Sequence, residues 1–130
     1  MKSFYLIIDS LSLNVPDPSD ITLHLEEKIP SYLTRVCIKN IILFGTREGL
    51  CYIHCDILNK DDNMLNGERC DILAILPVHT PIKYWFYKSV SLYKELKSTN
   101  FTSIRITLTD KENERLKNIR HVIFELEFIN

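Results

Sequence analysis

Two alternating runs within residues 103–128 constrain the fold more than any other part of the sequence. Apolar and polar residues alternate from Ile104 to Leu108, and they alternate again from Val122 to Phe128. A period of two is typical of a β-strand with one buried face. Residues 110–113, between the runs, are of the polar kind that turns use. The stretch therefore predicts two antiparallel strands that form a pair, the second of which completes a sheet.

Six further segments have the character of strands. Two of them, at 70–78 and 82–90, are apolar on both faces, which is typical of a strand that is central in a sandwich or part of an interface. The alternation of a third slips around Lys39 and Asn40, where we expect a β-bulge. The six segments are 3–9, 21–26, 35–44, 50–57, 70–78 and 82–90.

The connections between these segments indicate how the strands are arranged. Residues 45–49 (GTREG) predict a tight turn, so we expect the strands on either side of it to form a hairpin. Asn66-Gly67 predicts a turn within a polar loop, and residues 91–100 are either a short helical turn or an irregular crossing. The strand count favours an all-β fold, a single jelly-roll β-sandwich of about eight antiparallel strands, as one domain over residues 1–130.

Composition and charge exclude several classes of protein. The 130 residues carry a net charge of −1 and no run of five like charges, so we expect no direct nucleic-acid partner. The apolar runs are far shorter than the roughly 18 residues of a membrane span. Asp9 interrupts the first apolar run and no small-residue cleavage site follows it, so we expect no secretory signal and an intracellular site of synthesis.

The four cysteines do not predict a metal site or a disulfide. Cys51 and Cys55 would lie about 13 Å apart along one strand. A disulfide needs Cα atoms within about 7 Å, and two thiolates on one zinc must each lie about 2.3 Å from it. We therefore expect all four, which include Cys37 and Cys70, to be small buried residues in a reducing compartment.

The sequence contains few residues that suggest catalysis. It has three glycines, no glycine-rich phosphate loop and no G-x-S-x-G motif. A small hydrolase or metal enzyme would require His24, His54 and His121 to meet on one outer face. Glu125 and Glu127 share a strand face about 6.6 Å apart, a spacing that a glycosidase can use, but we interpret them as a solvated outer face. We expect no catalytic residue and no enzyme activity.

Calcium is the remaining cofactor to consider. Asp61, Asp62, Asn63 and Asn66 offer oxygen ligands in one loop. They lack the glycine and the terminal glutamate of an EF-hand loop. We therefore expect neither a metal ion nor any other cofactor.

The aromatic residues are the strongest candidates for a functional surface. Tyr84, Trp85, Phe86 and Tyr87 are consecutive, and Tyr93 follows shortly after. Because neighbours on a strand point to opposite faces, at least two of these side chains would face outward or lie under a loop. Core packing and carbohydrate stacking are alternatives. Interfaces are enriched in aromatic residues and depleted of charge, so we take all five as candidate interface residues.

The order of the segments resembles that of single jelly-roll minor capsid (penton-like) proteins of Polinton or Maverick elements, adintoviruses and virophages. The opening part is ITLHLEEKIP and RVCIKNIILF, and the closing part is CDILAILPV, YWFYKSV, SIRITLTDKENERL and HVIFELEF. An I-x-I-x-L-x-D strand stands as Ile104, Ile106, Leu108 and Asp110. The resemblance implies a non-enzymatic capsid subunit in the virion, pentameric at icosahedral vertices, that contacts its own copies and other capsid proteins.

A second function is compatible with the same fold. A lectin-like or tumour-necrosis-factor-like jelly roll would be a binding module for a glycan or a protein partner. It would be a monomer or a trimer with an exposed aromatic cleft near Trp85 and Tyr87.

Overall fold

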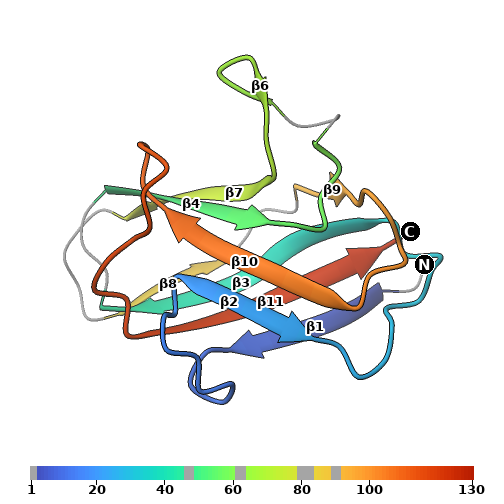
Figure 1. Cartoon of the computed structure of the whole chain (residues 1–130), viewed down its shortest axis with the longest axis horizontal. Helices are drawn as coiled ribbons and strands as arrows, with labels where there is room; N and C mark the ends of the chain where they lie inside the picture. The colour runs from blue at the N-terminus through green and yellow to red at the C-terminus, as the bar shows by residue number, and fades with distance from the viewer. Residues whose placement is uncertain (1–2, 46–48, 61–63, 79–83, 89–91) are drawn as a thin grey trace.

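The protein is built from two antiparallel sheets that face each other (Figure 1). The computed structural model describes residues 3–45, 49–60, 64–78, 84–88 and 92–130, and of residues 78 and 84–88 it describes the backbone alone. No α-helix occurs in this part of the chain. The eight longer strands are β1 (Ser3–Asp9), β2 (Asp20–His24), β3 (Arg35–Phe44), β4 (Gly49–Cys55), β7 (Ile72–Val78), β8 (Tyr84–Lys88), β10 (Ser103–Thr109) and β11 (His121–Ile129). Three strands have two residues each: β5 (Met64–Leu65), β6 (Glu68–Arg69) and β9 (Lys94–Glu95).

The order of the strands defines a jelly roll. Sheet A has the order β1-β11-β3-β8, with β9 also paired to β3, and sheet B has the order β2-β10-β4-β7. The longer strands are thus shared equally between two packed antiparallel sheets, as in a jelly roll of eight strands. This result confirms the predicted fold class and strand number.

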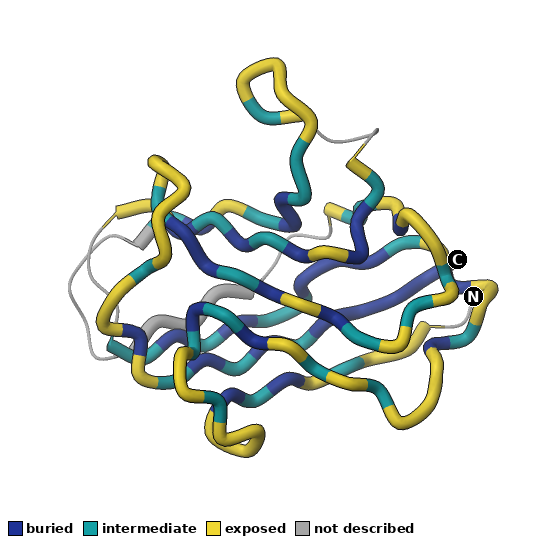
Figure 2. Tube along the Cα trace, in the orientation of Figure 1, coloured by how far each residue is buried: buried dark blue, intermediate teal, exposed yellow. Residues whose placement is uncertain are grey.

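The core lies between the sheets and follows the alternation of the sequence. Ile104, Ile106 and Leu108 of β10 are at most 1% exposed, and Phe124 of β11 is fully buried. Figure 2 shows buried residues along the inner strands of both sheets and exposed residues in the outer loops. The predicted bulge is confirmed at Lys39, since Glu125 lies opposite Asn40 whereas Leu126 lies opposite Ile38.

Two predicted strand pairings are wrong. β3 and β4 do not form a hairpin, because β3 belongs to sheet A and β4 to sheet B. β10 and β11 are likewise in opposite sheets, where each is an inner strand. Alternation shows which residues of a strand face the core, but it does not show which strand lies beside it. The two strands of each pair therefore lie in different sheets and share no strand pairing.

The connecting segments agree with the sequence at several points. Asn66 and Gly67 have φ values of 51° and 83°, and they form the predicted turn. The turn closes an unpredicted hairpin of β5 and β6, which projects from the sandwich beyond β7 (Figure 1). The described part of residues 91–100 is an irregular crossing that contains β9, not a helical turn.

The cysteines are free thiols. Cys37, Cys51 and Cys55 are buried, as expected, whereas Cys70 is only half-buried. Burial raises the pKa of Cys51 and of Cys55 to about 12, so both thiols are protonated and unreactive at neutral pH.

None of the described residues belongs to a helix long and apolar enough to cross a membrane.

Candidate assembly interface

The aromatic strand lies at an edge of sheet A. β8 pairs with β3, with Tyr84 opposite Phe44 and Lys88 opposite Asn40. No other described strand pairs with β8. The side chains of Tyr84, Trp85, Phe86 and Tyr87 lie outside the described part of the structure, so their role in an interface stays a prediction.

The fifth candidate, Tyr93, contacts a buried carboxylate. Its phenol donates a hydrogen bond to Glu127 Oε1, and the Tyr5 phenol donates one to Glu127 Oε2 at 2.7 Å. Lys39 Nζ lies 3.5 Å from the same carboxylate. The hydrogen bond from Tyr93, with smaller contributions from Tyr5 and Lys39, lowers the pKa of Glu127, and the carboxylate in turn raises the pKa of the Tyr93 phenol.

Glu127 therefore does not lie on a solvated face, and that interpretation was wrong. Glu127 is only 6% exposed, although its side chain points away from the core as the alternation predicts. Burial comes from Tyr5 on β1 and from Tyr93, which precedes β9. Glu125, the other member of the pair, is half-buried and accepts a 2.6 Å hydrogen bond from Asn40 Nδ2.

β7 is an edge strand with an apolar outer face. Among the described strands it pairs with β4 alone. Pro77 lies opposite Leu50 in this pairing, and proline, which cannot donate a hydrogen bond to a neighbouring strand, is typical of strand edges. Ile75 is 41% exposed. Of the two explanations that its apolar faces allowed, a central position does not hold for β7, and a place in an interface stays a prediction.

An apolar groove runs beside β7. It has a volume of about 340 Å³, and its lining includes Met64 and Leu65 of the projecting hairpin, Ala74 and Ile75 of β7, and Leu92. Met64 and Leu92 are both more than 60% exposed. Two of its lining residues, Met64 and Leu65, belong to the hairpin that projects from the sandwich beyond β7 (Figure 1). Large contiguous apolar patches are typical of surfaces that bind a partner, so the groove is a candidate contact surface.

β1 forms the edge of sheet A that lies opposite the β8 edge. It pairs with β11 and with no other described strand. Ile7 is 63% exposed and Tyr5 is 52% exposed on the face that points away from the core, and Leu11, in the loop that follows, is 64% exposed. Phe4 points inward at the rim of the core, where its ring meets Phe128 at 6.4 Å between centroids.

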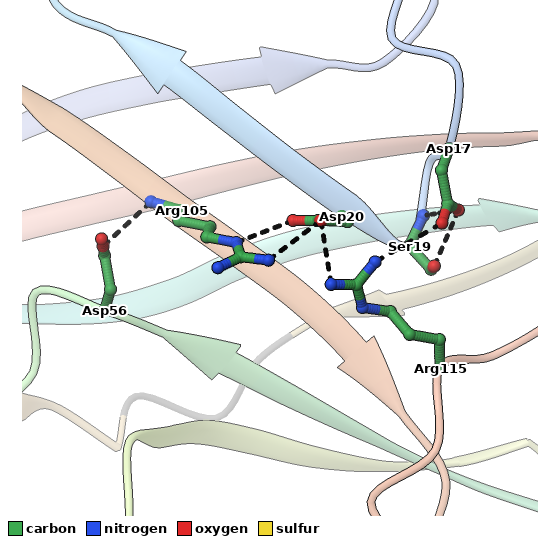
Figure 3. A network of polar contacts seen from close by, with 6 residues as sticks. All are labelled: Asp17, Ser19, Asp20, Asp56, Arg105 and Arg115. Carbon is green, nitrogen blue, oxygen red and sulfur yellow. Dashed lines mark hydrogen bonds and ion pairs between the residues drawn. The ribbon is translucent and has the colours of Figure 1, made fainter.

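The edge strand of sheet B beside β1 has a different character. Arg105 of β10 donates two hydrogen bonds to Asp20 of β2, at 2.9 and 3.0 Å. Arg115 Nη2 lies 2.9 Å from the same carboxylate, and Asp17 is within 3.6 Å of Arg115 Nη1 (Figure 3). These partners, Arg105 first, lower the pKa of Asp20. Paired charges on a short edge strand discourage association with another sheet.

His54 lies on the outer face of sheet B between two oxygen atoms. Its Nδ1 is 2.8 Å from Asp71 Oδ1, and its Nε2 is 2.9 Å from Thr109 Oγ1. Because a carboxylate oxygen only accepts, Nδ1 donates to Asp71, and in the tautomer with its proton on Nδ1 the other nitrogen, Nε2, accepts from the threonine hydroxyl. Hydroxyl, imidazole and carboxylate occur in this order in hydrolytic triads, here beside an open pocket of about 440 Å³. Thr109 is only 6% exposed, which favours a role in holding β4 to β10.

The histidines do not meet on one outer face. His24 ends β2 and His54 is in β4, both in sheet B, whereas His121 begins β11 in sheet A. His121 Nε2 lies 2.6 Å from Asp9 Oδ1, and its ring stacks on Phe44. The described residues contain no group of three potential metal ligands. Three of the residues considered for calcium, Asp61, Asp62 and Asn63, lie outside the described residues.

Comparison with known proteins bears on the fold. No protein-family model matches the sequence, and no curated protein matches it. The crystal structure of selenomethionine-labelled mavirus penton protein is similar over 99% of both chains, with a TM-score of 0.61 and 8% sequence identity. The infectious bursal disease virus VP2 subviral particle (TM-score 0.29, 12% identity, 99% of this chain and 33% of that chain) is too weakly similar to indicate a shared fold. The same holds for the Gx strain structure of that virus (TM-score 0.22, 11% identity, 99% and 42%). The chain therefore has the jelly-roll fold of the mavirus penton protein, which confirms at the level of fold the resemblance to penton-like capsid proteins.

Proposed function

We propose that this chain is a non-enzymatic structural protein of a viral capsid, a subunit of the penton or minor capsid type. The observation that carries the proposal is the likeness to the mavirus penton protein, which extends over 99% of both chains. A short jelly roll that matches a penton protein from end to end suits a subunit that acts as one domain over residues 1–130. Its location would be the virion and the intracellular site where virions assemble.

The proposed partners are further copies of the chain, as a pentamer, and other capsid proteins. Direct contact with nucleic acid or with a membrane is not part of the proposal. Two features of the described surface support assembly through protein contacts. β1 and β7 expose apolar side chains at sheet edges, and such edges are normally covered or blocked. We include Tyr84, Trp85, Phe86, Tyr87 and Tyr93 in the contact, because β8 is an edge strand beside the same core.

The mass of the protein in solution tests this proposal. We expect light scattering after size exclusion to give five times the 15.3 kDa chain mass, at all protein concentrations above a threshold and across a range of salt. Electron microscopy of the same sample should show rings. A stable trimer would instead favour a ligand-binding jelly roll, and a monomer at every concentration would contradict assembly of identical copies.

Trp85→Ala tests the aromatic contact within this assembly. We expect the variant to be a folded monomer, because the truncation removes contact area between subunits but leaves the β-sandwich intact. If the variant unfolds instead, with the loss of about 3–5 kcal/mol that is typical of a core aromatic, then Trp85 belongs to the core. The far-ultraviolet circular dichroism spectrum separates the two results.

A further inference from the structure

Strand order places two different apolar surfaces on opposite flanks of the sandwich. Sheet A runs from β1 to β8 and sheet B runs from β2 to β7. Figure 1 shows β1 and β2 along the lower side of the molecule and β7 along the upper side. A contact between these flanks would therefore join one copy to the opposite side of the next.

The lower flank presents a ridge. We define the β1 ridge as Tyr5, Ile7 and Leu11, each more than 50% exposed. Ile7 lies opposite Glu125 of β11, and Asp9 ends the same strand. Asp9 is the only acidic or basic residue within β1. The ridge is thus apolar, and carboxylates flank its central isoleucine.

The upper flank presents a groove. We define the β7 groove as Met64, Leu65, Ile75 and Leu92, together with Lys94, the only acidic or basic side chain in its described lining. Met64 and Leu65 of the β5–β6 hairpin line part of the groove, and the hairpin projects from the sandwich beyond β7 (Figure 1). A volume of about 340 Å³ accommodates several aliphatic side chains. The groove matches the ridge in apolar character. Lys94 gives the groove a positive charge, whereas the ridge is bordered by Glu125, which accepts a hydrogen bond from Asn40, and by Asp9, which is paired with His121.

We propose that the β1 ridge of one copy docks into the β7 groove of the next copy. This inference rests on the proposed function and names the surfaces through which the subunits associate. A head-to-tail contact of this kind forms a closed ring when the rotation between copies is suitable. Each contact covers the exposed edge of β1 and the exposed edge of β7 at once, and it brings Glu125 and Asp9 toward Lys94.

Mixing two blocked copies tests this arrangement. Ile7→Lys places a charge on the ridge and leaves the groove intact, whereas Ile75→Lys blocks the groove and leaves the ridge intact. We expect each variant alone to have the mass of a single chain. An equimolar mixture should have twice that mass, because one intact ridge then meets one intact groove and the second contact, lysine against lysine, is blocked. Light scattering after size exclusion measures all three samples.

The controls keep folding separate from assembly. Tyr32→Lys alters an exposed aromatic residue, 51% exposed, outside both surfaces, and it should keep the wild-type mass. Circular dichroism checks that every variant has the wild-type spectrum. Leu11→Lys on the ridge and Leu92→Lys beside the groove form an independent second pair, at positions 64% and 66% exposed.

The outcomes distinguish this inference from the proposed function. If the wild type assembles and the folded variants keep its mass, the ridge and groove are not the contact, while the capsid proposal stands. A mixture that stays at the mass of a single chain, or variants that each dimerise alone, would also overturn the head-to-tail arrangement. If the wild type is a monomer at every concentration, both proposals fail.

Discussion

Among single residues, the buried carboxylate of Glu127 has the most far-reaching contacts, because it connects three segments of the chain. Glu127 accepts hydrogen bonds from Tyr5 and Tyr93, which are 122 and 34 positions away in the sequence. A buried carboxylate is costly unless it is paired and hydrogen-bonded, and here both oxygens have partners. The cluster therefore fixes the position of β1 and of the segment before β9 relative to β11.

Replacement of Glu127 by glutamine should destabilise the protein in a pH-dependent way. At pH 7 we expect a loss of about 1–3 kcal/mol in the free energy of unfolding, typical of hydrogen bonds to a charged group. The pKa of Glu127 in the folded state is below its ordinary value of 4.5. The stabilisation by the charged form is thus complete above that value and is lost as the pH falls through the lowered pKa.

Urea denaturation from pH 7 down to about pH 3 measures this difference, which should narrow toward the acid end. Glu125→Gln is the matched control, because Glu125 is on the same strand face but is only half-buried. It should cost less than Glu127→Gln at pH 7. A gap between Glu127→Gln and wild type that is the same at both pH values would show that the charge of Glu127 contributes nothing.

The sequence predicted the face of Glu127 but not its burial. Alternation in β11 depends only on neighbouring residues, so it correctly placed Glu125 and Glu127 opposite the core residues. Burial depends on rings contributed by β1 and by Tyr93, and no local pattern reports such distant partners.

The contact between two elements of sheet A, the end of β3 and the segment before β11, depends on a single glycine, Gly45. Gly45 has a φ of +81°, and a Cβ atom there would lie 2.6 Å from the carbonyl oxygen of Asn118 and 2.9 Å from Arg120 Nε. Arg120 N also donates to the carbonyl oxygen of Phe44 at 2.9 Å. The residue that follows β3 and the segment that precedes β11 thus approach too closely at this point for a side chain at position 45.

Asparagine in place of glycine separates steric crowding from backbone strain. Asparagine tolerates a positive φ, as Asn66 and Asn118 do in this chain. Gly45→Asn should still cost about 1–3 kcal/mol in the free energy of unfolding through overpacking. Gly67→Asn, at a φ of +83° with open space around it, should change stability by about 0.5 kcal/mol or less. Chemical denaturation of both variants tests this, and equal costs would contradict the close approach.

The positions of the strands in the sequence were predicted better than the order of the strands in the sheets. The strand at 70–78 was correctly located, but Pro77 within it already indicated an edge position, which the apolar composition of both faces concealed. The two wrong pairings arose because a turn between two strands is compatible with a hairpin and with a crossing to the other sheet. No residue in GTREG distinguishes these alternatives.

In the molecule as a whole, strands that are far apart in the sequence pair with each other. β1 pairs with β11, the first described strand with the last, and β2 pairs with β10. β11 also pairs with β3 and so lies at the centre of sheet A. The fold class followed from local alternation, whereas this arrangement pairs segments that lie far apart in the sequence.

Refolding should therefore be slow and should depend on β11. Closing long loops before any contact stabilises them gives all-β sandwiches folding times of about milliseconds to seconds, and stopped-flow circular dichroism after dilution from denaturant measures this time. A chain that lacks residues 121–130 should not fold at all, because β1 then has no partner strand and β3 loses one side of its pairing. Refolding within microseconds, or a native β spectrum with cooperative unfolding in the shortened chain, would contradict this view. Because β1 is also the proposed ridge, a subunit would present that surface for assembly only after β11 has joined the sheet.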